Sequence, residues 1–177
     1  MASNMDLRAR FRAIKWRGLA LNVLLFAALA TGIRAWQHRD MPSGPAPALQ
    51  GRTLAGQPYD LPAHPEKPVL VHFWATWCPI CRSEQESIAS LAHDHPEVIT
   101  IAMQSGSPDA VSRHMHEQGV DFPVVNDADG ALSSAWGVHA VPASFIVAPD
   151  GRIRFIEVGY TTGVGLRLRL WLAGFWN

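Results

Sequence analysis

The chain has 177 residues, and its 15 Lys+Arg balance its 15 Asp+Glu, so the formal net charge is zero with His neutral. This length is enough for one domain with its own hydrophobic core plus an extension. Two cysteines allow at most one disulfide within the chain, which excludes a small secreted domain held together by several disulfides. Residues 1–40 carry seven basic and two acidic residues, and the mildly acidic remainder gives no support for nucleic-acid binding.

The N-terminal residues predict a membrane anchor. Residues 1–17 form a basic leader, and an uncharged stretch rich in Leu and Ala runs over residues 18–33. Trp16 and Trp36 bracket this stretch, at the positions where aromatic side chains favour the membrane–water interface. Positive charge before an apolar stretch keeps the leader in the cytoplasm and sends the following residues outside. We therefore expect a single-pass anchor at residues 18–36 in the bacterial inner membrane, with the rest of the chain in the periplasm.

A cleaved signal peptide is the alternative for the same residues. The apolar stretch is short for a spanning helix, which usually needs about 17 to 25 residues. Ala28-Leu29-Ala30 also resembles a signal-peptidase site. Both interpretations place the remainder of the chain in the periplasm or an equivalent exterior, where thiols need a dedicated supply of electrons to stay reduced.

The next residues lead into a folded domain. Residues 37–48 contain several prolines and few large apolar residues, which predicts a tether. Residues 49–61 alternate short apolar positions around two glycines, and this pattern predicts a small β-hairpin. Residues 69–75 form a nearly continuous apolar run, which is typical of a central buried strand.

The only two cysteines directly follow that strand, in Trp77-Cys78-Pro79-Ile80-Cys81, and residues 82–92 have the pattern of a helix. A strand that delivers a C-x-x-C to the first turn of a helix is the typical setting of a dithiol redox centre. Unpaired N–H groups and the positive end of the helix dipole favour a thiolate at Cys78, which we expect to be the more exposed cysteine and the nucleophile. Cys81 lies one turn further on and can resolve a mixed disulfide.

Other interpretations of the two cysteines fit less well. A structural zinc site needs four ligands, and only one C-x-x-C is present. A c-type haem site needs His directly after the second cysteine, where the chain has Arg82. A purely structural disulfide between residues three apart would add little stability because the loop that it closes is short. A Cu(I) site on two thiolates is a chemically reasonable alternative.

Strands and helices alternate over the rest of the chain. The predicted strands cover residues 98–103, 122–125, 144–147 and 153–158, and the predicted helices cover residues 108–118, 131–136 and 162–174. Gly119 is placed to cap the first of these helices. The last helix contains an alternating Leu/Arg run that also fits a strand, but its length and its i, i+4 apolar pairs favour a helix. This order predicts an α/β fold with a central mixed β-sheet flanked by helices.

The segment Phe73-Trp74-Ala75-Thr76-Trp77-Cys78-Pro79-Ile80-Cys81, followed by Val141-Pro142, resembles the thioredoxin fold. Within that fold the chain is similar to the membrane-tethered periplasmic branch that includes the TlpA, ResA and CcmG proteins, and most similar to the suppressor-for-copper-sensitivity D (ScsD-like) family. Residues 121–127, 130–133 and 166–171 carry the finer resemblance. We therefore expect a thioredoxin-like domain over residues 49–177.

The resemblance implies roles for residues around the dithiol. Pro142 matches a cis-proline that faces the cysteines, and the backbone at Val141 pairs there with the substrate chain like an added strand. Trp77 and Pro79 are expected to shape the substrate groove. Glu84 matches a glutamate that reducing members of this branch place near the dithiol to handle protons. The alternative for Glu84 is a solvated acid in the first turn of a helix, where it complements the dipole.

His72 departs from thioredoxin, which has a buried acid at this strand position. An imidazole there could take the proton from Cys81 when that residue attacks the mixed disulfide. A hydrogen-bonded core histidine is the alternative that we favour. We expect no metal site from the histidine pairs in residues 93–95 and 114–116, because side chains two positions apart point to different sides of a helix.

The resemblance implies a membrane-tethered periplasmic protein thiol–disulfide oxidoreductase that reduces oxidised client proteins. An integral membrane thiol reductant would resupply its electrons, and no bound cofactor is required because the cysteines are the redox group. Clients implied by the resemblance are proteins under copper stress or apocytochrome thiols. The rival interpretations are an oxidase that donates disulfides, a Cu(I)-binding module, and a redoxin-type peroxidase, for which only Thr76 is suggestive.

Overall fold

The computed structural model describes residues 18–29, 31–32 and 42–176. The chain divides into two compact units, residues 1–39 and residues 40–177. In the first unit, the described residues are helical. None of the helices that the structure describes is both long and apolar enough to cross a membrane. The predicted leader and parts of the predicted anchor and tether lie outside the described residues.

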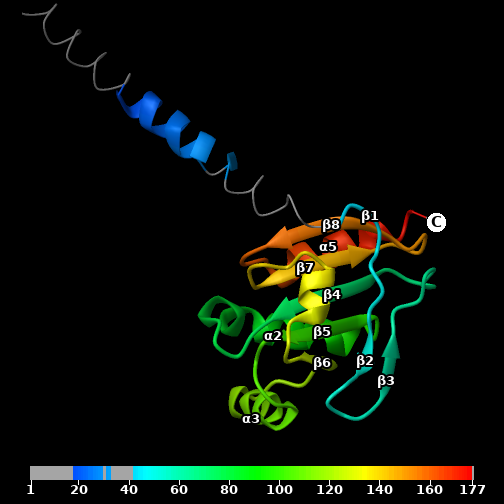
Figure 1. Ribbon diagram of the computed structural model, residues 1–177. Coiled ribbons are helices and arrows are strands. Elements are labelled where there is room, and N and C mark those ends of the chain that lie inside the picture. The colour runs from blue at the N-terminus through cyan, green and yellow to red at the C-terminus, as the bar shows by residue number, and fades with distance from the viewer. Residues whose placement is uncertain (1–17, 30, 33–41, 177) are drawn as a thin grey trace, which may run out of the picture. The chain divides into compact units, whose positions relative to one another are not determined.

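A mixed β-sheet organises the second unit (Figure 1). Over residues 42–176 its strand order is β1-β8-β7-β4-β5-β6. These strands are β1 (Gly44–Pro45), β4 (Val69–Trp74), β5 (Val98–Met103), β6 (Val124–Asp127), β7 (Ala143–Val147) and β8 (Arg152–Val158). β4, β5 and β6 run parallel, and β7, β8 and β1 extend the sheet with antiparallel pairings. A separate hairpin joins β2 (Gln50–Arg52) to β3 (Pro58–Asp60).

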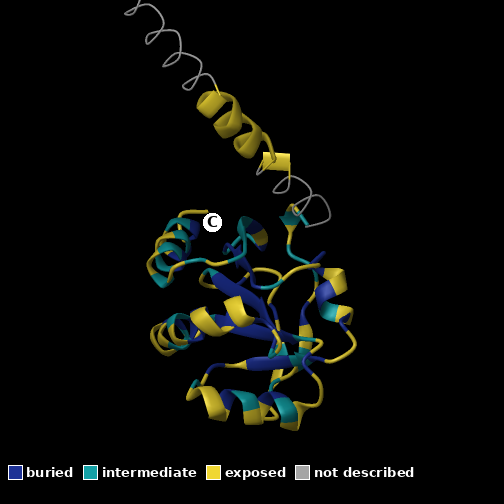
Figure 2. Ribbon diagram, turned by 90° about the vertical axis from the view of Figure 1, so that its left-hand side faces the viewer, coloured by how far each residue is buried: buried dark blue, intermediate teal, exposed yellow. Residues whose placement is uncertain are grey.

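Helices cover both faces of this sheet. They are α2 (Pro79–Asp94), α3 (Pro108–Gln118), α4 (Ala131–Ala135) and α5 (Gly163–Ala173). Side chains from α2, α3 and α5 form one core cluster, whereas Trp136 at the end of α4 and residues flanking the hairpin belong to a second cluster. β4 serves both clusters, because alternate side chains of a strand point to opposite faces of the sheet. Figure 2 shows mostly buried strands between helices whose outward faces are exposed.

Proline and small polar residues set the helix boundaries. α2 begins at Pro79, earlier than the predicted residue 82, because proline suits the first position of a helix and Cys78 serves as the N-cap. α3 begins at Pro108 after the cap residue Ser107, whose hydroxyl accepts the backbone N–H of Ala110 at 3.3 Å. α3 ends as predicted at Gly119, which adopts the left-handed conformation with φ 65°.

Two predicted boundaries are wrong. β6 begins at Val124 and not at residue 122, because Phe122 packs edge-on against Trp74 in the core and Pro123 has no N–H for a sheet ladder. Gly44 and Pro45 fall within the predicted tether, yet they form β1 on the edge of β8 and satisfy backbone groups there. The folded domain therefore begins before residue 49. The hairpin, the central strand and the C-terminal helix are confirmed.

The second core cluster is centred on an aromatic triad. Trp136 is completely buried, and its ring centroid lies 5.8 Å from that of Phe73 and 5.1 Å from that of Phe145. Its indole Nε1 has no hydrogen-bond partner among the described residues. The contribution of Trp136 to stability therefore comes from packing and burial rather than from a hydrogen bond.

We predict that Trp136→Ala lowers the free energy of unfolding by about 3–5 kcal/mol, because it leaves a cavity in a close-packed core. Trp136→Phe should cost less, roughly 1–2 kcal/mol, since the apolar ring is kept and no hydrogen bond is lost. Urea unfolding of the oxidised protein followed by circular dichroism measures both values. Equal losses for the two variants would contradict the packing argument.

Candidate active site

A disulfide joins Cys78 to Cys81, whose Cα atoms are 5.3 Å apart. Both residues lie at the point where β4 ends and α2 begins. The sulfur of Cys78 accepts the backbone N–H of Cys81 at 3.1 Å, so it occupies the place of a capping side chain. The positive end of the α2 dipole favours negative charge on that sulfur once the disulfide is reduced. This geometry supports the choice of Cys78 as the nucleophile.

An exposed apolar rim surrounds the disulfide. Trp77 is 59% exposed and Ile80 is 50% exposed, whereas Cys78 is only 4% exposed and Cys81 is 1% exposed. Cys78 is thus the more accessible cysteine, as predicted, but by a small margin. Pro79 also lies on this exposed rim. Trp77, Pro79 and Ile80 are thus the exposed residues next to the sulfur of Cys78.

The loop before β7 faces the dithiol from the other side. The Val141–Pro142 peptide bond is cis, which confirms the predicted cis-proline. The carbonyl oxygen of Val141 lies 3.6 Å from the sulfur of Cys78. The carbonyl of Pro142 accepts the backbone N–H of Gly159 at 2.8 Å, which ties this loop to the end of β8. The pairing of Val141 with a substrate backbone stays a prediction.

The turn after β5 supports the loop that carries the cysteines, and the sequence interpretation missed this contribution. The indole Nε1 of Trp77 donates to the carbonyl of Gln104 at 3.2 Å, and the backbone N–H of Thr76 donates to Ser105 Oγ at 3.0 Å. Gln104 has a positive φ of 44°, unusual for a residue other than glycine. The available signal was Ser105-Gly106 directly after a predicted strand, because parallel neighbouring strands end at the same edge of a sheet.

Glu84 is a buried residue of α2, the helix that begins at the dithiol. It lies three residues after Cys81 on the same face of α2 and is only 2% exposed. Its carboxylate accepts the backbone N–H of Thr161, just before α5. Burial raises the pKa of Glu84 to about 7, although the hydrogen bond from Thr161 acts in the opposite direction. The alternative of a solvated helix acid is therefore wrong, and the proton-handling role stays a prediction.

His72 is a hydrogen-bonded core histidine, the interpretation that the sequence favoured. It is 3% exposed, and its Nδ1 lies 2.9 Å from Ser144 Oγ on the neighbouring strand β7. Burial lowers the pKa of His72 to about 4, so the imidazole is neutral near neutral pH. His72 shares the face of β4 that carries Leu70 and Trp74, and those two side chains belong to the same core cluster as Cys81.

The described residues contain no group of three or more His, Cys, Asp or Glu side chains that could hold a metal ion. His114 takes part in packing, since its ring lies 5.8 Å from that of Trp74 and its Nε2 is 3.3 Å from the side-chain nitrogen of Gln85. Redox chemistry at this site can proceed through the two sulfur atoms themselves.

Comparisons with known proteins agree with this geometry. Residues 41–164 match the Redoxin family. The chain is 31% identical over 129 residues to the "Thioredoxin-like protein" of Haemophilus influenzae, covering 73% of this chain and 74% of the relative. It is 26% identical over 161 residues to "Sporulation thiol-disulfide oxidoreductase A" of Bacillus subtilis, covering 84% and 96%. The crystal structure of StoA from Bacillus subtilis superposes with a TM-score of 0.62 at 26% identity, covering 72% of this chain and 98% of StoA.

The raised pKa of Glu84 predicts a pH-dependent stability. The folded state holds this proton more tightly than the unfolded chain, with a pKa of about 7 against 4.5, so ionising Glu84 opposes folding. We compare the free energy of unfolding of the wild type with that of Glu84→Gln. The wild type minus the variant should fall by up to about 3 kcal/mol as pH rises from 4.5 to about 7, and this difference should stay level at higher pH.

Urea titrations of the oxidised proteins between pH 4 and 8.5 measure this difference. Glu86→Gln, which removes an exposed carboxylate from the same helix, is the matched control. A difference between wild type and Glu84→Gln that does not change with pH would contradict the raised pKa.

Proposed function

The chain belongs to the Redoxin family and is a thioredoxin-like thiol–disulfide oxidoreductase, and we propose that it acts as a membrane-tethered periplasmic reductase of protein disulfides. The observation that carries the reductase direction is the electrostatic environment of Cys78. Its sulfur lies near the carbonyl oxygen of Val141 and behind an apolar rim, and Glu84 is the nearest buried acid on α2. None of the hydrogen bonds or ion pairs described for residues 42–176 places a cationic side chain on that sulfur.

This environment favours a reductase for a physical reason. A dithiol is strongly oxidising when its reduced form is stabilised, which a cation beside the nucleophilic thiolate achieves. Here the α2 dipole and the backbone N–H of Cys81 favour a thiolate at Cys78, but no cation does, while the Val141 carbonyl and an ionised Glu84 oppose negative charge on the sulfurs. The reduced pair is thus weakly stabilised, so it gives up electrons readily.

The proposed reaction proceeds by two thiol–disulfide exchanges. The thiolate of Cys78 attacks one sulfur of a client disulfide, and the other client sulfur leaves as a thiolate, which takes a proton. The thiol of Cys81 then loses its proton and attacks the sulfur of Cys78. The bond between Cys78 and the client breaks, the second client thiol is released, and the enzyme is left with the Cys78–Cys81 disulfide.

Local groups supply position and proton transfer in this scheme. The backbone of Val141, next to the cis-proline Pro142, aligns the client chain against Cys78, while Trp77 and Pro79 contact its side chains. Glu84 takes the proton from Cys81, since a carboxyl whose pKa lies near 7 can both accept and return a proton at neutral pH. His72, neutral in the core, stays a structural residue in this proposal.

The sequence supports the tether and the compartment. The basic leader and the apolar stretch at residues 18–33 fit an inner-membrane anchor with the domain in the periplasm, where an integral membrane thiol reductant would return two electrons to the oxidised pair. The finer relation to the ScsD-like family, with clients under copper stress or apocytochrome thiols, is part of this proposal. A disulfide-donating oxidase is the competing function, and the first experiment below separates the two.

We predict a reduction potential of roughly −270 mV or below for the Cys78–Cys81 pair, the range of a reducing thioredoxin. The potential is measured on the full chain in detergent, equilibrated in glutathione and dithiothreitol buffers. Ile80→Lys, which adds a cation on the rim beside Cys78, should raise the potential by about 30 mV or more, whereas Ile80→Gln should not. A wild-type value near about −120 mV would identify an oxidase instead.

We also predict that Cys81→Ser stops the reaction at the mixed disulfide. With insulin as a disulfide-containing client, the variant should accumulate a covalent adduct and lose at least about 100-fold in turnover, because no thiol remains to resolve it. Non-reducing electrophoresis and peptide mass spectrometry measure the adduct and its position. Cys78→Ser is the matched variant, and an adduct forming equally well on it would overturn the assignment of the nucleophile.

A further inference from the structure

The outer face of α5 carries an apolar stripe. Val164, Leu168, Trp171 and Phe175 are 78%, 54%, 62% and 67% exposed. Val164, Leu168 and Trp171 recur at helical spacing along one side of α5, and Phe175, in the turn after the helix, packs on Trp171 with the ring centroids 4.8 Å apart. The opposite side, with Leu166, Leu170 and Ala173, is buried in the core. The stripe is therefore not needed to hold α5 on the domain.

Exposed apolar side chains of this size are confined to two places on the folded domain. Within residues 42–176, the large exposed hydrophobic residues are Trp77 and Ile80 on the rim of the dithiol, and Tyr160 with the residues between 164 and 176. Single exposed hydrophobic residues are ordinary, but a contiguous patch on an otherwise polar surface marks an interaction site. The rim lies at the dithiol and belongs to the redox site. The α5 stripe has no role in that site and needs another explanation.

The charged side chains of α5 are engaged beside the stripe rather than on it. Arg167 forms an ion pair with Asp94 of α2 at 2.7 Å, and Arg169 forms one with Glu157 of β8 at 2.7 Å. Both guanidinium groups are thus held toward neighbouring elements of the domain. The stripe between them presents an uninterrupted apolar surface.

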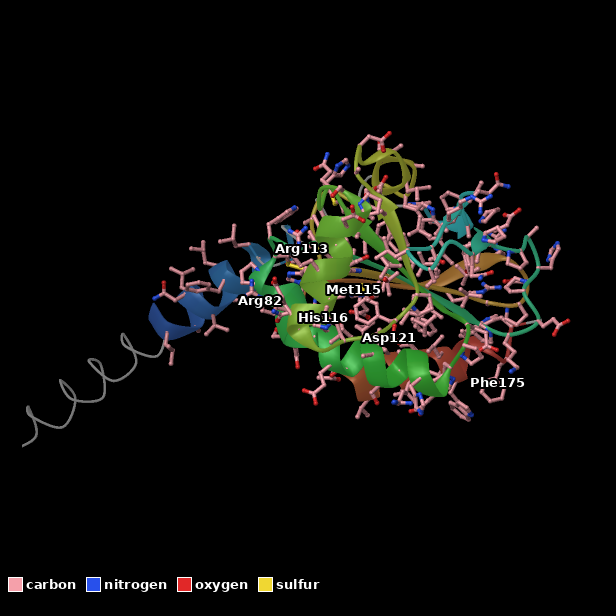
Figure 3. The ribbon with its side chains drawn as sticks, turned by 90° about the horizontal axis from the view of Figure 1, so that it is seen from below. Arg82, Arg113, Met115, His116, Asp121 and Phe175 are labelled. Carbon is pink, nitrogen blue, oxygen red and sulfur yellow. A yellow bond between two sulfur atoms is a disulfide. The ribbon has the colours of Figure 1, made fainter. Side chains whose placement is uncertain are left out.

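The aromatic end of the stripe lies where the chain enters the domain. Gly44 of β1 pairs with Ile153 of β8, and two residues further along β8 the ring of Phe155 lies 5.9 Å from that of Trp176. Figure 1 shows β1, β8 and the C-terminal end together at one side of the sheet. Figure 3 shows Phe175 at the edge of the molecule, apart from the labelled residues of α3.

The length of chain before β1 restricts where this corner can be. Seven residues, 37–43, separate the end of the predicted anchor from β1. Seven residues span at most about 25 Å even when fully extended. If residues 18–36 are anchored, the start of β1 stays within that distance of the bilayer surface, and Trp176 packs on β8, the strand that pairs with β1. Exposed tryptophan and phenylalanine on one face of a helix are the residues that favour the membrane interface.

We propose that the α5 stripe docks on the surface of the phospholipid bilayer that holds the anchor. The partner of the stripe is thus the lipid interface. The proposal rests on the membrane tether of the proposed function. Docking along α5 also sets the position of the dithiol, because Thr161, two residues before α5, donates its N–H to Glu84 on α2, one turn after Cys81. The domain is thereby held with its redox pair close to the membrane plane, within reach of a membrane-embedded thiol reductant.

The test uses the full chain reconstituted in vesicles of phosphatidylethanolamine and phosphatidylglycerol that contain a phospholipid with a photoreactive diazirine in its acyl chain. After illumination, trypsin digestion and mass spectrometry locate the lipid adducts. Three peptides report separately: residues 18–34 for the anchor, residues 170–177 for the end of α5, and residues 114–152 for the second half of α3 and for α4. We expect adducts on the first two peptides and not on the third.

A pair of variants separates docking from mere proximity. Trp171→Glu with Phe175→Glu places two charges on the stripe and should lower labelling of the α5 peptide by at least about fivefold, with the anchor still labelled. Ser112→Glu with Gln118→Glu adds the same charges at exposed positions of α3 and should leave the α5 labelling unchanged. Insulin reduction in detergent, compared with the wild type, verifies that both variants remain folded and active.

The outcomes distinguish the inference from the function on which it rests. A labelled anchor with an unlabelled α5 peptide overturns the docking and leaves the tether intact. An unlabelled anchor and an unlabelled α5 peptide overturn both the tether and the docking, while reductase activity in detergent still supports the chemistry. An unlabelled α5 peptide, together with a dimer of the full chain in detergent that Trp171→Glu with Phe175→Glu abolishes in sedimentation, assigns the stripe to a second copy of the chain and overturns the proposal.

Discussion

The position of the α2 N-terminus at the end of β4 is the constraint on which the site depends. β4 is buried on both faces between β5 and β7, so its register is set by the core and cannot slip without exposing apolar side chains. The chain leaves that strand and enters α2 within a few residues, with Cys78 as the cap. Everything else in the site is placed around this junction: the loop at Val141 from the antiparallel side and the turn at Gln104 from the parallel side.

Two buried titratable groups, Glu84 and His72, lie on the dithiol side of the sheet. Burial shifts their pKa values in opposite directions. Burial raises the pKa of Glu84 to about 7 and lowers that of His72 to about 4, because in each case it disfavours the charged form. The two effects on stability oppose each other: between about pH 4 and 6.5 the neutral His72 makes stability rise with pH, whereas ionisation of Glu84 makes it fall. Near neutral pH His72 stays neutral, so of these two groups only Glu84 titrates there, as its proposed proton-transfer role requires.

The sequence predicted most of the fold because its signals are local and agree with one another. The C-x-x-C between a buried strand and a helix, the turn glycines and the apolar runs each specify an element, and the cis-proline followed from the resemblance. The boundaries that failed depend on contacts across the sheet: β1 exists because β8 offers an open edge, and β6 starts late because Phe122 packs on Trp74. The hydrogen-bond partners of Glu84 and Trp77 could not be predicted either. Glu84 accepts the backbone N–H of Thr161 and Trp77 donates to the backbone carbonyl of Gln104, and backbone groups carry no residue-specific signal.

α5 connects the surroundings of the dithiol with the corner that we propose docks on the membrane. Its first turn follows the backbone N–H that holds Glu84, and its last turn precedes the aromatic residue that packs on β8 beside the start of the domain. One side of this helix is buried in the core, and two ion pairs, Arg167–Asp94 and Arg169–Glu157, tie it to α2 and β8. An exposed apolar stripe on such a helix would be a liability for a freely diffusing protein, because it invites association. The cost is understandable if, as we propose, the stripe fixes how the dithiol faces a membrane that supplies its electrons.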